Sequence, residues 1–307
     1  MSFVEDRLAN YIQASYLEGK LGIACSAGID SMVLLAAACK VYSKEDIVCL
    51  HLDHGLREDS PLAADFIRNY CKEHGIELAL KTFEPGEIEA SELGARKARY
   101  QFFEDAAQEQ GLEHILLGHN LNDQAETILF RIIRGTNTAG LQGIPRWREH
   151  GSIVIHRPLL DIARIEIVEY AQQNGIDFVE DSSNHKLEFA RNRIRHNILP
   201  EAVQINPRAI ENIVQLSTLV QMEQDYLSLD VETAAENLGP LPWPLELFRT
   251  IEPVIQRKLL EHFFTPNIAF VHDFMAAIRE GGFHRINFSK GKFFAIKQKM
   301  IHLEMAD

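Results

Sequence analysis

Three stretches of the chain combine chemically active residue types with the spacing of a strand-to-helix turn. The first, Ser26-Ala27-Gly28-Ile29-Asp30-Ser31, lies between the apolar run Leu21–Cys25 and the Ala/Leu-rich run Met32–Cys39. A strand, a tight turn and a helix start can bind phosphate, because the first amides of a helix lack internal partners and its dipole attracts an anion. The acidic Asp30 fits such a turn if a Mg²⁺ ion bridges carboxylate and phosphate. An ordinary strand–helix connection is the alternative.

The second stretch, His51-Leu52-Asp53-His54-Gly55-Leu56-Arg57, places two imidazoles and a carboxylate at the end of another predicted strand. It is incomplete as a metal site. We interpret it as a wall for a nucleotide base, and the alternative is a turn held by side-chain hydrogen bonds.

The third stretch, Leu117–Thr127, is denser in polar groups than a structural turn requires. Asp123 and Glu126 lie three residues apart at a predicted helix start, so they share a face. Two carboxylates facing a phosphate site suit a cationic substrate, such as an ammonium group, or general-base catalysis. The alternative is that Asn122 or Asp123 simply caps the helix.

Basic residues are concentrated in a chain whose net charge is −13. Arg131–Arg148 holds four arginines and no acid, His185–Arg208 holds five Lys/Arg against two acids, and Arg285–Lys299 holds five Lys/Arg and no acid. These three patches are candidates for contact with nucleic-acid phosphates. Within the second, Arg191 and Arg195 share a helix face, and guanidinium groups suit phosphate or a developing negative charge. Solvated basic surfaces are the alternative.

Strand and helix patterns alternate along the first two thirds of the chain. Strands are expected at 21–25, 46–53, 76–82, 114–118, 153–155 and 176–180, and helices at 1–20, 32–39, 60–74, 91–110, 123–134 and 162–174. This alternation predicts an α/β fold with a doubly wound, mostly parallel sheet, whose carboxyl ends bind ligands. The three polar stretches all follow such ends and should therefore converge in one crevice.

The pattern changes after Pro200. Helices are expected at 206–226, 251–264 and 272–280, and two strands at 286–303 around the turn Ser289-Lys290-Gly291-Lys292. We predict a catalytic domain over 1–208 and a smaller, mainly helical domain over 209–307.

The N-terminus has early acids and no long apolar core, and no apolar run reaches 18 residues, so we expect a cytoplasmic protein without a membrane segment. The four cysteines form no C-x-x-C pair, which argues against a sulfur-transferring protein with an iron–sulfur cluster.

The order of several stretches is more specific than any one of them. After SAGIDS come HLDHGLRE, LGARKARYQFF, LLGHNLNDQAETILFRIIRGTNTAGLQGIP, HRPLLDIARIEIVEYAQQNGIDFVEDSSN and FARNRIRHNILP. In this order they resemble the short form of the tRNA(Ile)-lysidine synthetase family of PP-loop ATPases. The resemblance implies that ATP activates C2 of the cytidine at the first anticodon position of tRNA(Ile), which has a CAU anticodon. Free lysine then attacks to give lysidine, AMP and pyrophosphate, and a homodimer is also implied.

The resemblance also implies roles for individual residues. Asp123 and Glu126 would recognise lysine and act in catalysis with Asp30, and Asp30 would hold Mg²⁺. Arg191, Asn192 and Arg195 would lie near the reacting nucleotide, with Arg191 and Arg195 taking part in catalysis. We further expect Arg131 and Arg134 to contact tRNA. The residues expected to bind ATP are Ser26, Ala27, Gly28, Ile29, Asp30, Ser31 and His54.

Two positions depart from the family pattern. Ala27 replaces the first glycine of Ser-Gly-Gly-x-Asp-Ser, so the loop is strained if this position needs a positive φ. Asn122 replaces one carboxylate of the usual His-His-x-Asp-Asp, which could weaken metal or lysine binding. Two alternatives stay open: another PP-loop enzyme that adenylates a different base or a small substrate, and a non-catalytic nucleotide- or RNA-binding protein.

Overall fold

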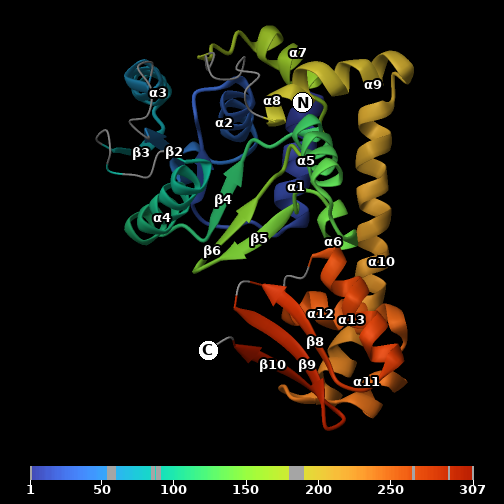
Figure 1. Cartoon of the computed structure of the whole chain (residues 1–307). Helices are drawn as coiled ribbons and strands as arrows, with labels where there is room; N and C mark the ends of the chain where they lie inside the picture. Colours follow the sequence, from blue (N-terminus) through green and yellow to red (C-terminus); the bar gives the residue numbers. More distant parts are fainter. Residues whose placement is uncertain are drawn as a thin grey trace. The chain divides into compact units, whose positions relative to one another are not determined.

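The computed structural model describes residues 2–53, 60–83, 87, 91–179, 190–264, 267–289 and 291–305 (Figure 1). The chain forms two compact units. The first contains Met1–Thr127 and Gly143–Val214, and the second contains Ile128–Gln142 and Gln215–Asp307. Two helices, α5 (Leu121–Arg134) and α10 (Ala209–Leu238), therefore begin in the first unit and end in the second. The boundary after residue 208, with the roles assigned to its two sides, stays a prediction.

A six-stranded sheet forms the centre of the first unit, in the order β3-β2-β1-β4-β6-β5. Neighbouring strands are parallel except β5, which runs antiparallel to β6. The chain proceeds from β1 outward to β2 and β3 and then crosses to β4 on the other side of β1, so the switch point of the sheet lies between β1 and β4. This confirms the predicted α/β class. The strands are β1 (Leu21–Ala24), β2 (Ile47–Asp53), β3 (Glu77–Thr82), β4 (His114–Leu117), β5 (Trp147–His150) and β6 (Ile153–His156).

Helices cover both faces of this sheet. Alternate residues of β2 show the two faces: Ile47 and Cys49 belong to one apolar core, and Val48 and Leu50 belong to another. The first core also contains residues of α1 (Phe3–Ala14), α2 (Ile29–Val41), α3 (Ser60–His74) and α7 (Arg164–Asn174). The second core contains Tyr100, Phe102 and Phe103 of α4 (Glu92–Gln110). Burial on both sides explains why β1, β2 and β4 are almost continuously apolar.

The strand predicted at 176–180 is wrong for residues 176–179, and Glu180 lies outside the described residues. Gly175 ends α7 with a φ of +60°, and the backbone amide of Val179 donates to the carbonyl of Ala27 at 3.0 Å. This segment therefore lies against the loop after β1. The edge beyond β6 is instead occupied by β5, whose alternating exposed and half-buried residues lack the apolar signal of a strand.

Among the described residues 190–205, three short helical segments precede α10: α8 (Ala190–Arg193), the π-helical turn η3 (Ile194–Ile198) and α9 (Leu199–Ile205). Single π-helical turns are often found at functional sites. A further short 3₁₀ helix, η1 (Lys44–Asp46), precedes β2.

The second unit has a four-stranded antiparallel sheet in the order β7-β10-β9-β8. Its core contains Trp243, Phe248, Phe274 and Phe294, all fully buried. The two strands expected at 286–303 are in fact three, because Gln298 and Lys299 turn the chain with φ of +51° and +59° between β9 and β10. Neither is a glycine or asparagine, so the sequence has no turn signal there. The elements are α6 (Thr138–Leu141), β7 (Trp243–Pro244), α11 (Leu245–Thr250), α12 (Pro253–Phe263), α13 (Ile268–Glu280), β8 (His284–Ser289), β9 (Lys292–Lys297) and β10 (Met300–Met305).

Candidate active site

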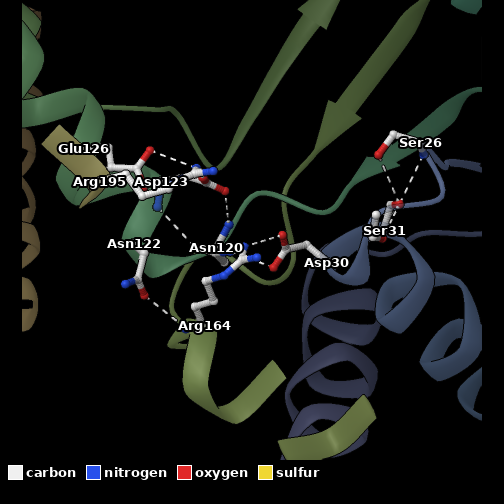
Figure 2. A network of polar contacts seen from close by, with 10 residues as sticks. Ser26, Asp30, Ser31, Asn120, Asn122, Asp123, Glu126, Arg164 and Arg195 are labelled. Carbon is white, nitrogen blue, oxygen red and sulfur yellow. Dashed lines mark hydrogen bonds and ion pairs between the residues drawn. The ribbon is translucent and has the colours of Figure 1, made fainter. Parts of the chain in front are cut away.

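The turn between β1 and α2 is closed by the hydroxyl of Ser31. Its Oγ donates to the carbonyl of Gly28 at 2.8 Å and accepts from the amide of Ser26 at 3.1 Å (Figure 2). Ser31 is buried, whereas Ser26 is exposed. The first amides of α2, which begins directly after Gly28, have no acceptor within the helix. Ser31 therefore shapes the turn: its amide also donates to the carbonyl of Gly28 at 3.1 Å, and its Oγ lies 3.4 Å from the Ser26 hydroxyl. The exposed Ser26 hydroxyl and the amides of Ile29 and Asp30, at the start of α2, are the donors suited to an anion.

Ala27 adopts a left-handed backbone conformation with a φ of +68°. This conformation favours glycine, because the Cβ of an L-residue crowds the following carbonyl. Ala27 is nevertheless fully buried in the core of the first unit, and its carbonyl accepts the amide of Val179. These contacts hold Ala27 in the left-handed conformation, at the expense of local backbone strain.

Gly118 brings the end of β4 against the start of α2. A Cβ at this position would lie 3.0 Å from the backbone C and O atoms of Asp30 and 3.1 Å from the amide nitrogen of Ser31. A side chain would thus push on the backbone of the turn. The absence of a Cβ at Gly118 lets the loops after β1 and β4 meet at the switch point.

Asp30 is the hub of contacts between the two loops. Its Oδ1 accepts from Nδ2 of Asn120 at 2.8 Å, and its Oδ2 accepts from Nη1 of Arg164 at 2.8 Å (Figure 2). Asn120, which is 1% exposed, also donates its backbone amide to Oδ2 of Asp123 at 3.0 Å and accepts the amide of Asp123 at 3.1 Å. Asn120 therefore connects the carboxylates of Asp30 and Asp123, because its side chain donates to the first and its backbone amide donates to the second.

Asp123 and Glu126 lie on the first turns of α5 and share Arg195 of η3. Arg195 donates its Nε to Glu126 at 2.6 Å, and its Nη2 to Glu126 at 2.9 Å and to Asp123 at 3.0 Å. The side chain of Glu126 is only 6% exposed, whereas that of Asp123 is 21% exposed. One guanidinium thus holds both carboxylates, and charge-assisted forks of this kind are strong and directional.

Two acids of this network, Asp30 and Glu126, have raised pKa values because they are buried. Burial raises the pKa of Asp30, and the charge of Asp123 raises it further, against the opposing charge of Arg164. Burial likewise raises the pKa of Glu126, while Arg195 opposes the shift. Burial lowers the pKa of Arg195, but the hydrogen bond and charge of Glu126 outweigh it and leave the pKa raised. Perturbed carboxyl groups of this kind are typical of functional sites.

The other predicted site residues lie on several different elements of the chain. His54 lies outside the described residues, although His51 before it places Nδ1 2.7 Å from the carbonyl of Cys25. Arg191 and Asn192 lie on α8, one turn before Arg195. Arg131 and Arg134 lie on the part of α5 that belongs to the second unit, and Nη1 of Arg131 donates to the carbonyl of Gly140 at 2.8 Å.

The sequence predicts no role for Arg164 or Asn120, and it predicts Asn122 only as the loss of a carboxylate. Asn122 Oδ1 accepts the backbone amide of Arg164 at 3.0 Å, at the first residue of α7 (Figure 2). This contact places the Arg164 guanidinium beside Asp30. The only signal in the sequence was the density of asparagines at 120–122, because the partner residues are more than 40 positions away.

The residues present fit a metal only if a ligand completes the site. In the part of the chain that the structure describes, no group of three or more His, Cys, Asp or Glu side chains could hold a metal ion. Mg²⁺ commonly binds one or two protein carboxylates together with substrate phosphates and water. Asp30, partly exposed beside the phosphate-type turn and near a second carboxylate, suits that mode.

Comparison with known proteins identifies the class to which this site belongs. The profile of the PP-loop domain matches residues 2–202, and the chain belongs to this family of ATP-binding domains. The solved U34-tRNA thiolase NcsA of Methanococcus maripaludis aligns with a TM-score of 0.60 and 16% identity, covering 71% of this chain and 78% of that one. At this identity the likeness concerns the fold alone.

The similarity to curated proteins is more specific than the match to the domain family. The tRNA(Ile)-lysidine synthase of Thermosipho africanus is 37% identical over 257 residues, which are 78% of this chain and 58% of that protein. The protein of the same name in Enterococcus faecalis is 33% identical over 250 residues, 79% of this chain and 54% of the relative. This chain therefore spans little more than half the length of these relatives.

Among its described residues, no helix is long and apolar enough to cross a membrane.

Proposed function

We propose that this protein uses ATP to join lysine to C2 of the cytidine at the first anticodon position of tRNA(Ile). The observation that carries the proposal is that Asp123 and Glu126, held by Arg195, share one polar network with Asp30 of the phosphate-type turn. The names of the relatives in T. africanus and E. faecalis support the same reaction.

The turn after β1 would hold ATP. The amides that begin α2 and the exposed hydroxyl of Ser26 are suitable donors for phosphate oxygens, and Gly28 leaves room for them because it has no side chain. Ala27, Ile29 and Ser31 complete the turn, and His54 would contribute to the nucleotide site. Mg²⁺ on Asp30 would offset the charge of the phosphates.

In the first step, O2 of the cytidine attacks the α-phosphorus of ATP. A bond forms between O2 and phosphorus, the bond to the β-phosphate oxygen breaks, and pyrophosphate leaves. The carbonyl at C2 is a poor electrophile, and adenylation converts its oxygen into a good leaving group. Arg191, Asn192 and Arg195 would lie near this nucleotide, where guanidinium groups stabilise developing negative charge.

In the second step, the ε-nitrogen of lysine attacks C2. The bond between C2 and O2 breaks, AMP departs with that oxygen, and lysidine remains. The amine must lose a proton to react, and Asp123 and Glu126 are the carboxylates available to bind the ammonium group and accept that proton. The raised pKa of Glu126 supports this assignment, because a carboxylate with a higher pKa is a stronger base. Arg131, Arg134 and the C-terminal part 209–307 would contact the tRNA.

Incubation of the full chain with ATP, labelled lysine and a tRNA(Ile) transcript with a CAU anticodon tests the proposal. We expect label in the tRNA and release of AMP and pyrophosphate. ATP consumption without label would indicate an adenylating enzyme with another substrate. Binding of ATP and tRNA without turnover would indicate a non-catalytic protein.

Asp123→Asn tests the role of the carboxylate with little change in shape. We expect lysine transfer to fall by about 100-fold or more, the usual magnitude for a group that handles a proton, while ATP affinity changes less than about twofold. Asp65→Asn, at an exposed position of α3, is the matched control. An equal loss of ATP affinity in Asp123→Asn would contradict the assigned role.

A further inference from the structure

Several arginines gather around Tyr100 in the first unit, apart from the carboxylate network. The guanidinium Cζ of Arg148 lies 4.4 Å from the centre of the Tyr100 ring, and that of Arg96 lies 4.9 Å from it. Arg157 directly follows β6, and Arg148 pairs across the sheet with Ile155, two residues before it. Burial lowers the pKa of Arg157, and the charges of Arg148 and Arg96 contribute to the shift. Three cations from α4, β5 and the residue after β6 thus share one region.

Nitrogen atoms of this group are buried without a hydrogen-bond partner. Arg157 is 2% exposed, and although its Nη1 donates to the carbonyl of Pro145 at 2.7 Å, its Nε has no acceptor. The Nε of Arg148 and the Nδ1 of His119 are also buried without a partner. Among the described residues five buried side-chain atoms lack a partner, and three of them belong to this group. The Nε atoms of Arg148 and Arg157 are donors, and an unpaired buried donor costs about 1–3 kcal/mol, so an acceptor for these two guanidinium groups would be favoured here.

No carboxylate in the described part of the chain forms an ion pair with Arg96, Arg148 or Arg157. Glu104 is directed to His150 instead, at 3.5 Å, and the His150 ring lies 4.8 Å from that of Tyr100. Burial lowers the pKa of His119, at the end of β4, to about 3, and the charges of Arg157 and Arg96 contribute to this shift. This region of the first unit is therefore positively charged.

We propose that Arg96, Arg148 and Arg157 form a binding site for a backbone phosphate of the RNA substrate. The three differ in depth, because Arg157 is buried, Arg148 is half-buried and Arg96 is exposed. Such a gradient suits a phosphate that stays attached to a polymer in solvent, and arginine forks match phosphate oxygens. His119 directly precedes Asn120, so the bound strand would run next to the carboxylate network. The inference rests on the proposed function, since it names how the RNA is held.

The salt dependence of RNA binding tests this site. The affinity of the full chain for the tRNA(Ile) transcript is measured between 50 and 200 mM salt for wild type, Arg96→Gln, Arg148→Gln and the double variant. Each lost phosphate contact should lower the slope of log affinity against log salt by about one. Arg148→Lys should keep the slope, because it keeps the charge. Arg68→Gln on α3, whose side chain is 54% exposed, is the control and should leave the slope unchanged.

The inference is overturned if the wild-type protein binds no RNA, or if the slope is unchanged in the double variant. It is also overturned if the variants lose ATP affinity in place of RNA affinity, since the arginines would then bind the nucleotide. Circular dichroism confirms that each variant is folded. If wild type binds RNA with the expected slope and the variants lower it, but no lysine is incorporated, the phosphate site stands and the proposed reaction fails.

Discussion

Ala27 combines a strained backbone with a position at the centre of the candidate site. The pattern Ser-Gly-Gly-x-Asp-Ser has glycine at this position, and the φ of +68° found here is one that only glycine adopts without a steric penalty. Burial of the Ala27 methyl group and the contact between its carbonyl and Val179 keep the conformation in place. Alanine therefore occupies a left-handed position in this turn, at the expense of backbone strain.

Ala27→Gly should stabilise the protein. A left-handed backbone destabilises an L-residue by about 1–2 kcal/mol, and glycine removes this penalty. Glycine also has more freedom in the unfolded chain, which offsets about 0.5–1 kcal/mol of the gain. We therefore expect the free energy of unfolding in urea to rise by about 0.5–1 kcal/mol. Ala36→Gly, within α2, should lower it by about 1 kcal/mol. A destabilised Ala27→Gly would show that the lost methyl contacts outweigh the strain.

The end of β4 lies against the start of α2, and this contact brings the polar stretches after β1 and β4 together in one site. The prediction that polar stretches following β1 and β4 converge is confirmed by the contact of Asn120 with Asp30. The stretch after β2 extends beyond the described residues, so its part in the crevice stays a prediction. Convergence of β1 and β4 was predictable because the carboxyl ends of parallel strands share one edge of the sheet.

Two glycines in this region should respond differently to alanine. Gly118→Ala places a Cβ 3.0 Å from the backbone of Asp30, so we expect losses of about 1–3 kcal/mol in stability and of ATP affinity together. At Gly28 the nearest atom to a new Cβ is Ser26 Oγ at 3.5 Å, an ordinary contact. Gly28→Ala should therefore fold normally and lose ATP affinity alone. Urea unfolding and nucleotide titration separate the two, and normal ATP binding by Gly28→Ala would contradict a close phosphate.

Buried imidazoles connect the stability of the whole molecule to pH. His156 is 5% exposed, with Nδ1 3.0 Å from the Tyr11 hydroxyl and Nε2 3.2 Å from Nδ1 of His114. Burial lowers the pKa of His156 to about 4, and the charges of His114 and Arg157 contribute. The folded state thus binds this proton more weakly than the unfolded state, in which a histidine pKa is about 6.5.

Stability should therefore fall as the pH drops below about 6.5 and should continue to fall to about 4. For His156 alone we expect a loss of about 2 kcal/mol between pH 7.5 and 5, because each pKa unit is worth about 1.4 kcal/mol. His156→Gln cannot titrate and should flatten the pH dependence of urea unfolding, whereas His272→Asn, at an exposed position, should follow wild type. A His156→Gln curve parallel to wild type would contradict this account.

Local signals in the sequence determined the α/β class, most element positions and the residue types of the site, because hydrophobic periodicity and turn residues act over a few neighbours. Pairing between distant residues was decided only in the tertiary structure. Arg195 reaches carboxylates about 70 positions away, Arg164 reaches Asp30 across 134, and Asn122 becomes a cap for α7. The segment 176–179 joins a loop in place of the sheet for the same reason: hydrogen-bond partners are chosen by proximity in the folded chain, which no local pattern encodes.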